Sequence, residues 1–141
     1  MKHRIIVFAV VVSLAAPWLA MSCSCIETSL QEALDAYDAV FVGKVIRLEF
    51  LRNQEGIDIV RATLKPLEVV KGAVPSEVEF VVSNGCCYCD YWFDIAETYL
   101  IFARSNGNSW DTDACSRSGK IKDVANDLKA LGLERLIPPQ R

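Results

Sequence analysis

The six cysteines of this 141-residue chain constrain its fold more than any other feature, because all of them follow a predicted export signal. They are Cys23, Cys25, Cys86, Cys87, Cys89 and Cys115. Thiols of exported proteins oxidise and persist as disulfides, so we expect a small domain stapled by bridges. The spacing of the cysteines alone does not select a pairing. A four-thiolate zinc site drawn from Cys86, Cys87, Cys89 and one other cysteine is the competing interpretation.

Residues 1–22 have the pattern of a signal peptide. Lys2 and Arg4 precede an apolar run over residues 5–16, and small residues lead up to Cys23. A membrane-spanning helix needs about 20 apolar residues, so this run is too short to cross a bilayer comfortably. We therefore expect cleavage before Cys23, a secreted or extracytoplasmic location (extracellular, periplasmic or cell surface), and no transmembrane segment in the mature chain. An uncleaved anchor and a lipoprotein acylated at Cys23 are the alternatives.

The charge balance and the histidine content of the mature chain exclude several classes of function. Loss of Lys2 and Arg4 lowers the 15 basic residues to 13, against 18 acidic ones, for a net charge of −5. Nucleic-acid binding relies on Lys and Arg, so we expect no nucleic-acid partner. His3 is the only histidine in the sequence, and it lies within the predicted signal. Histidine-dependent catalysis and imidazole metal sites are thereby excluded, and we expect neither an enzyme nor a cofactor of its own.

The pattern of apolar residues predicts a mainly β fold with short helices. Alternation of apolar and polar residues indicates five strands, at residues 39–50, 57–70, 78–82, 98–104 and 109–115. Helical spacing indicates a helix over residues 28–38, capped by Thr28 or Ser29, and another over residues 122–131 that stops at Gly132. Pro66, inside the second strand, predicts an irregularity or an edge position there. Five short strands with hairpin-like spacing favour a small barrel, formed by one domain over residues 23–141.

The mature chain begins Cys23-Ser24-Cys25, which resembles the opening of the tissue inhibitors of metalloproteinases (TIMPs), whose N-terminal domain is of the netrin-like (NTR) type. Further matches follow in the family's order, at residues 38–45, at 69–72, at Cys89-Asp90-Tyr91, at 99–103 and at Cys115-Ser116-Arg117. The resemblance implies a closed five-stranded OB-like β-barrel with flanking short helices. That architecture agrees with the strand pattern of this chain.

The resemblance also implies how four of the cysteines pair. The family's bridges correspond to Cys23–Cys89 and Cys25–Cys115 in this sequence. Cys86 and Cys87 have no counterpart in the family and are unassigned. They would form a bridge with each other, or one of them would compete with Cys89 for Cys23.

By the same resemblance, the N-terminus is an inhibitory wedge formed by Cys23, Ser24 and Cys25. The family uses the free amine and the carbonyl of its first cysteine to chelate the catalytic zinc of a metalloendopeptidase, and the next side chain enters the specificity pocket. In this chain Cys23 is then the chelator and Ser24 the pocket residue. Zinc enters only as part of the bound protease. Inhibition is therefore the expected function.

Two other functions are weighed against inhibition. In the first, Cys23 and Cys25 only staple the N-terminus to the barrel, and the chain is an extracytoplasmic structural or protein-interaction module. In the second, the chain is a thiol enzyme that uses Cys86, Cys87 and Cys89. The mature chain has no histidine to support a lowered thiolate pKa, which disfavours the enzyme.

Overall fold

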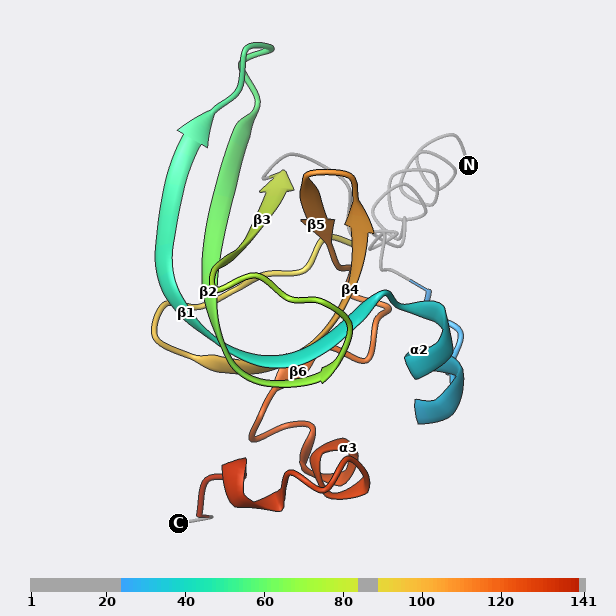
Figure 1. Cartoon of the computed structure of the whole chain (residues 1–141). Helices are drawn as coiled ribbons and strands as arrows, with labels where there is room; N and C mark the ends of the chain where they lie inside the picture. Colours follow the sequence, from blue (N-terminus) through green and yellow to red (C-terminus); the bar gives the residue numbers. More distant parts are fainter. Residues whose placement is uncertain (1–23, 84–88, 140–141) are drawn as a thin grey trace, which may run out of the picture.

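The computed structural model describes residues 24–83 and 89–139, and this part of the chain contains six strands (Figure 1). They are β1 (Ala39–Arg52), β2 (Asp58–Lys71), β3 (Val78–Ser83), β4 (Thr98–Asn106), β5 (Ser109–Asp111) and β6 (Gly119–Lys120). Neighbours follow the order β1-β2-β3-β5-β4, and β4 pairs back onto β1. The pairing of β3 with β5 is parallel and the other strand pairs are antiparallel. The predicted closed five-stranded, OB-like barrel is therefore confirmed.

The first two strands form a hairpin that extends beyond the rest of the barrel (Figure 1). Pairing continues from Val40↔Lys71 to Arg52↔Asp58. The turn is closed by the Asn53 carboxamide oxygen, which accepts hydrogen bonds from two backbone N–H groups at 3.0 and 2.8 Å. The register shifts within the ladder, once beside Pro66, and such bulges bend a strand pair. The predicted irregularity at Pro66 is confirmed.

The first part of β1 and most of β4 are buried on both faces, which accounts for their nearly continuous apolar sequence. Inside the barrel, side chains from all five barrel strands make one core, among them Phe41, Leu64, Phe80, Ile101 and partly buried Trp110. Alternate residues of β1 and β4 face outward into a second core. That core contains Val40, Val42, Leu100, Phe102 and Leu128. Residues 98–104, the most hydrophobic predicted strand, therefore supply both cores.

Helix α2 (Leu30–Ala36) is fixed at both of its ends. Ser29 caps the first turn, where its hydroxyl accepts the Glu32 N–H and the Glu32 carboxylate accepts the Ser29 N–H. These hydrogen bonds also lower the pKa of Glu32. At the other end the Lys71 ammonium donates to the carbonyls of Leu34 (2.5 Å) and Tyr37 (2.7 Å). The end of β2 thereby holds α2 against the barrel.

The C-terminal part differs from its prediction in length. Helix α3 (Ala125–Ala130) is shorter than residues 122–131, because the N–H groups of Asp123 and Val124 both donate to Lys120 in a preceding turn. Gly132, at φ +73°, ends this segment as predicted, and a 3₁₀ turn, η1 (Glu134–Leu136), follows. The fifth strand is also shorter than predicted. It ends at Asp111, because the chain then turns toward Cys115.

Candidate functional site

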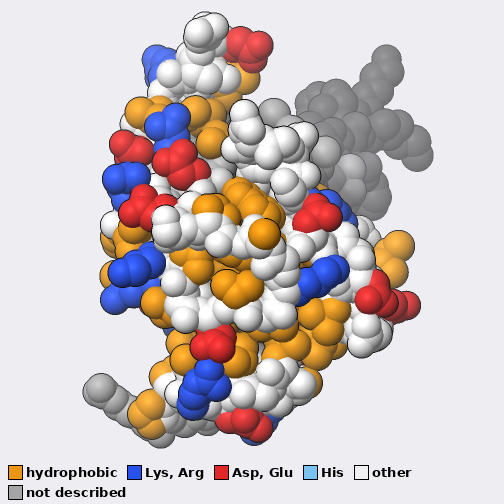
Figure 2. Space-filling view, viewed as in Figure 1, with side chains coloured by type: hydrophobic (Ala, Val, Ile, Leu, Met, Phe, Trp, Pro, Cys, Tyr) orange, Lys and Arg blue, Asp and Glu red, His pale blue; other side chains and the backbone are white. Residues whose placement is uncertain are grey.

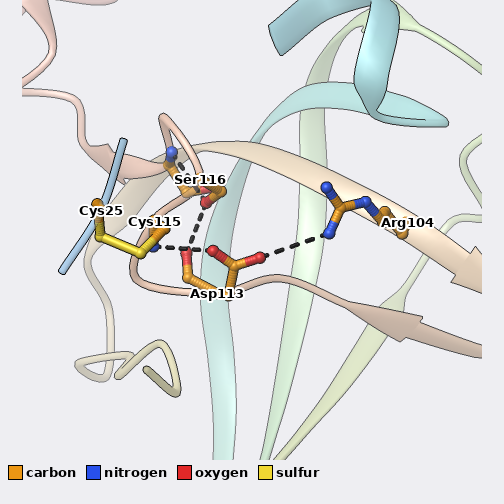
Figure 3. The surroundings of a disulfide bond; sticks show 6 residues. Cys25, Arg104, Asp113, Cys115 and Ser116 are labelled. Atoms are coloured by element: carbon orange, nitrogen blue, oxygen red, sulfur yellow. Dashed lines mark hydrogen bonds and ion pairs between the residues drawn. A yellow bond between two sulfur atoms is a disulfide. The ribbon is translucent and has the colours of Figure 1, made fainter. Parts of the chain in front are cut away.

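The candidate site is built around the leading segment, residues 24–28, which lies before α2 and belongs to no helix or strand. All five residues are exposed, and the Ile26 side chain retains 87% of its accessible surface. A disulfide joins Cys25 to Cys115, with the two Cα atoms 5.2 Å apart (Figure 3). This is the Cys25–Cys115 pairing implied by the TIMP resemblance. An exposed segment is thus covalently attached to the barrel at its second residue.

Cys115 is presented by a loop, residues 112–118, that is shaped by Asp113 (Figure 3). One carboxylate oxygen of Asp113 accepts the Cys115 N–H at 2.8 Å, and the other lies 3.6 Å from the Arg104 guanidinium on β4. The Asp113 carbonyl accepts both the N–H (3.1 Å) and the hydroxyl (2.7 Å) of Ser116. Asp113 therefore acts as the centre of a hydrogen-bonded turn. We call residues 112–118 the Cys115 loop.

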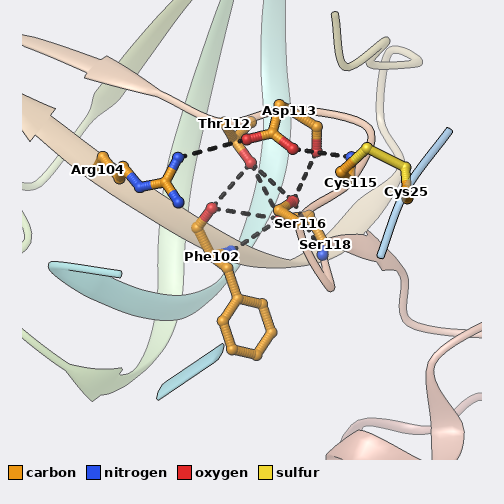
Figure 4. Close-up of polar contacts among 8 residues, drawn as sticks. All are labelled: Cys25, Phe102, Arg104, Thr112, Asp113, Cys115, Ser116 and Ser118. Carbon is orange, nitrogen blue, oxygen red and sulfur yellow. Dashed lines mark hydrogen bonds and ion pairs between the residues drawn. A yellow bond between two sulfur atoms is a disulfide. The ribbon is translucent and has the colours of Figure 1, made fainter. Parts of the chain in front are cut away.

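Three hydroxyls attach the Cys115 loop to β4 (Figure 4). The Thr112 hydroxyl donates to the Phe102 carbonyl at 2.8 Å and lies 3.1 Å from the hydroxyls of both Ser116 and Ser118. Ser118 in turn accepts the Phe102 N–H at 2.8 Å. Thr112 and Ser116 are buried. Thr112 and Ser118 thus satisfy the Phe102 carbonyl and N–H in place of a neighbouring strand, and Ser116 links these two residues.

Arg117 connects the leading segment to the C-terminal helix. Its guanidinium donates to both carboxylate oxygens of Asp127 on α3, at 2.6 and 3.0 Å, and to the Thr28 carbonyl at 2.6 Å. The hydrogen bonds that Arg117 donates to Asp127 raise the pKa of Arg117. Bidentate pairs of this kind fix geometry as well as adding energy. The leading segment is thus held at Cys25 and again at Thr28.

An open recess of about 350 Å³ lies beside the leading segment. Its walls come from the leading segment, from α2 and from the Cys115 loop, and include Ile26, Glu32, Tyr37, Arg104 and Asp113. The Arg104 guanidinium carbon lies 4.3 Å from the centre of the Tyr37 ring. Burial raises the pKa of Tyr37, and the charge of Asp113 raises it further. The recess therefore offers an apolar floor with one basic and two acidic groups at its rim.

The structure brings only some of the predicted site residues together. Ser24 and Cys25 lie on the exposed leading segment, as the wedge hypothesis requires. Cys89 is disulfide-bonded, and its carbonyl accepts the Ala114 N–H at 2.8 Å, next to the Cys25–Cys115 bridge. Its predicted partner Cys23, the unassigned Cys86 and Cys87, and the predicted signal peptide lie outside the described residues.

Sequence reasoning did not find Arg117 and Asp127 as a pair. Arg117 was noted only as part of the matched Cys115-Ser116-Arg117, and Asp127 only fell within the predicted helix over residues 122–131. The two residues are ten positions apart and meet through tertiary packing, so no local pattern announces their contact. Asp113 was also not recognised as the residue that shapes the Cys115 loop. An aspartate two residues before a cysteine is a weak signal for such a turn.

No family model matches this chain, and no curated protein is similar to it in sequence. Within residues 24–83 and 89–139, no three His, Cys, Asp or Glu side chains are grouped closely enough to hold a metal ion. In the same part of the chain, no helix combines the length and apolar character needed to cross a bilayer.

Proposed function

We propose that this chain is a secreted, stoichiometric inhibitor of a zinc metalloendopeptidase. In this proposal the amine and carbonyl of Cys23 chelate the catalytic zinc of the protease, and Ser24 enters its specificity pocket. A catalytic zinc keeps one coordination position open for water or substrate, so a good ligand in that position stops turnover. An α-amine has a pKa of about 8, so its deprotonation on zinc costs little at neutral pH.

The observation that carries the proposal is the double attachment of an exposed leading segment. Cys25 is bridged to Cys115, and Thr28 is held by Arg117. Ser24, before the first attachment, and Ile26, between the two, remain exposed. A segment that is ordered before binding loses less conformational entropy when it enters an active site, which favours affinity.

The test asks whether a free α-amine at Cys23 is required for inhibition. N-terminal mass analysis of the exported protein first establishes whether the chain begins at an unmodified Cys23. The purified protein is then titrated against a panel of zinc endopeptidases, and we expect one-to-one inhibition of at least one of them. A variant with one additional alanine before Cys23 moves the charged amine away from the metal and should lose that inhibition.

The matched control carries the additional alanine after Arg141, at the other end of the chain, and should inhibit like the unextended protein. Circular dichroism and thermal unfolding should be the same for all three proteins. Equal behaviour of the two extended variants, whether both inhibit or neither does, would contradict zinc chelation by the Cys23 amine.

The alternative function, an extracytoplasmic protein-interaction module without inhibition, is favoured by a second exposed region. Trp92 and Ile95, on the segment between β3 and β4, each keep more than half of their surface accessible. Exposed aromatic side chains of this kind are common at protein-binding surfaces. Ala96, which follows, has a φ of +64°, an unfavourable conformation for a residue other than glycine. An inert leading segment, together with partner binding that Trp92→Ala abolishes, would support this function.

A further inference from the structure

The edge of β1 opposite β2 loses its strand partner at Val45. Up to Lys44 this edge pairs with β4. Val45 then exchanges hydrogen bonds with the segment before β4, donating to Glu97 at 2.9 Å and accepting from Ala96 at 3.1 Å. Beyond that point β1 pairs with β2 alone, and within the described part of the chain no strand covers the other edge of residues 46–52. A row of backbone N–H and C=O groups is therefore open to a further strand.

This free edge is accessible and carries apolar side chains. It belongs to the part of the hairpin that extends beyond the barrel (Figure 1), so a neighbouring strand can approach without meeting the barrel wall. Ile46, Phe50 and Leu51 are 41%, 77% and 37% exposed. Proteins commonly protect an exposed edge with proline, with charged side chains, with a β-bulge or with a very short strand. The register with β2 shifts between Val45 and Arg47, at the start of this edge, and runs without a further shift from Arg47 to Arg52. Residues 46–52 contain no proline and remain in strand conformation to the end of β1.

The charges along this part of the sheet alternate in sign. Arg47 lies 3.7 Å from Glu49 of the same strand and 3.8 Å from Glu79 on β3, and Glu49 is also 3.7 Å from Arg61 on β2. Figure 2 shows basic and acidic side chains interspersed along the side of the molecule formed by β1 and β2. All four side chains are between about one third and about one half exposed, so their charges stay accessible to a partner although they also pair with one another.

We propose that the free edge of β1 pairs antiparallel with the same edge of a second copy of this chain, about a two-fold axis at Leu48. In that register Arg47 faces Glu49 of the second copy, and the reverse pair forms on the other side of the axis. Ile46 then stands opposite Phe50 of the second copy. Opposite charges and large apolar side chains are favourable cross-strand pairs. A two-fold interface repeats each contact, so the same short sequence supplies both halves.

Charge selects this register over its neighbours. An axis at Glu49 places the two Glu49 side chains opposite each other, which is unfavourable. An axis at Phe50 places Arg47 opposite Asn53 and Glu49 opposite Leu51, which leaves no charged pair. The arrangement about Leu48 is the one that satisfies Arg47 and Glu49 together, and this self-complementarity favours a second copy over an unrelated peptide.

The predicted dimer is weak, because one strand edge buries less surface than a standard stable interface. We expect dissociation constants in the micromolar to millimolar range. The edge lies on a different part of the molecule from the leading segment (Figure 1), so dimerisation and protease inhibition are separate properties. Failure of one leaves the other unaffected.

The test measures the dimer by sedimentation equilibrium over a wide range of protein concentration. Arg47→Glu gives copies whose facing pairs are both acidic, and Glu49→Arg gives copies whose facing pairs are both basic. Each variant alone should dimerise at least tenfold more weakly than the unchanged protein. An equimolar mixture should dimerise again. Both facing pairs between the two variants then join an acidic side chain of the Arg47→Glu copy to a basic side chain of the Glu49→Arg copy.

The matched control is Lys65→Glu, which makes the same change of charge at an exposed position of β2, away from the free edge. It should dimerise like the unchanged protein, and thermal unfolding should show that all variants are folded. A monomer at every concentration would overturn the proposal. So would a dimer that Arg47→Glu leaves unchanged, or a mixture of the two variants that remains monomeric.

Discussion

The Cys115 loop and the outer half of the β1–β2 hairpin are two extensions of the same barrel that are stabilised in opposite ways. The loop is held by a disulfide, by buried hydroxyls and by the Asp113 turn. The hairpin is held by its backbone ladder and by ion pairs between exposed side chains. Exposed ion pairs contribute little, whereas buried hydrogen bonds and long-range bridges contribute more. Rigidity is therefore concentrated around the leading segment.

Two buried threonines, one in each region, differ in the same way in their hydrogen bonding. Thr112, in the Cys115 loop, donates to the Phe102 carbonyl and contacts two further hydroxyls. Thr63, on β2, is fully buried, and its hydroxyl has no hydrogen-bond partner among the described residues. Burying a hydroxyl without a hydrogen-bond partner lowers the stability of the folded state. Good hydrogen bonds offset the desolvation cost of a buried hydroxyl. The hairpin region therefore tolerates a buried hydroxyl without a hydrogen-bond partner, whereas residues 112–118 contain none.

Removal of the Cys25–Cys115 bridge should have the largest effect on stability. The bridge joins residues 90 positions apart, and the loop-entropy model assigns about 4 kcal/mol to a closure of that size. We therefore expect Cys25→Ser with Cys115→Ser to lower the free energy of unfolding by about that amount, measured by urea denaturation. Ser24→Ala, at an exposed neighbouring position, is the control and should change nothing. A loss in the double variant no larger than that of the control would mean that the bridge is dispensable.

The strands of the barrel were predictable from the sequence, whereas the pairing of the cysteines was not. Alternation of apolar residues and the glycine at 132 placed the four longest strands and the end of α3 to within a few residues, because both signals are local. The spacing of the cysteines left their pairing open, and the correct Cys25–Cys115 assignment came from the family resemblance. Strand β6 was missed, since two residues carry no periodicity.

The residues that hold the candidate site were the least predictable part. Ser24 and Cys25 were recognised because they stand in a short motif. Arg117, Asp127 and Thr112 act through contacts between distant segments, and each is an ordinary surface residue by its sequence neighbours alone. Long-range polar contacts leave no signal in a single sequence, whereas buried faces do.

Thr112→Val should destabilise the protein by about 1–3 kcal/mol, because it replaces a buried donor with a methyl group. The Phe102 carbonyl would keep only a long contact of 3.5 Å from Ser118. Thr112→Ser is the control: it retains the hydroxyl, and we expect a smaller loss. Chemical denaturation measures both variants. If the valine variant is as stable as the serine variant, the hydroxyl network does not hold the loop.

Alkaline pH should weaken the barrel through its buried tyrosines. Burial is the main cause that raises the pKa of Tyr37, Tyr91 and Tyr99 above the ordinary value of about 10. The folded state therefore holds these protons more tightly than the unfolded state. The resulting stability is fully present below about pH 10 and is lost as pH rises toward the folded-state values.

Tyrosinate absorbance and circular dichroism, followed together as the pH is raised from about 9 to about 13, test this expectation. Ionisation of the three tyrosines should coincide with loss of structure. Tyr91→Phe keeps a ring in the aromatic cluster with Phe93 and Tyr99 and removes one ionising group, so it should shift the unfolding transition to higher pH. Ionisation of all tyrosines in a fully folded protein would contradict the proposed burial effect.

Thr63→Val should have the smallest effect and the opposite sign to Thr112→Val. Threonine and valine have nearly the same shape, and the Thr63 hydroxyl has no hydrogen-bond partner among the described residues. Replacing it with a methyl group removes the cost of burying an unpaired polar atom and adds apolar surface to the sheet. We expect a gain of about 1 kcal/mol in the free energy of unfolding, measured by the same denaturation. The same exchange thus costs stability in the Cys115 loop and adds it in the hairpin region. Destabilisation by Thr63→Val would show that its hydroxyl is paired in solution, and the two threonines would then no longer distinguish the hairpin region from the Cys115 loop.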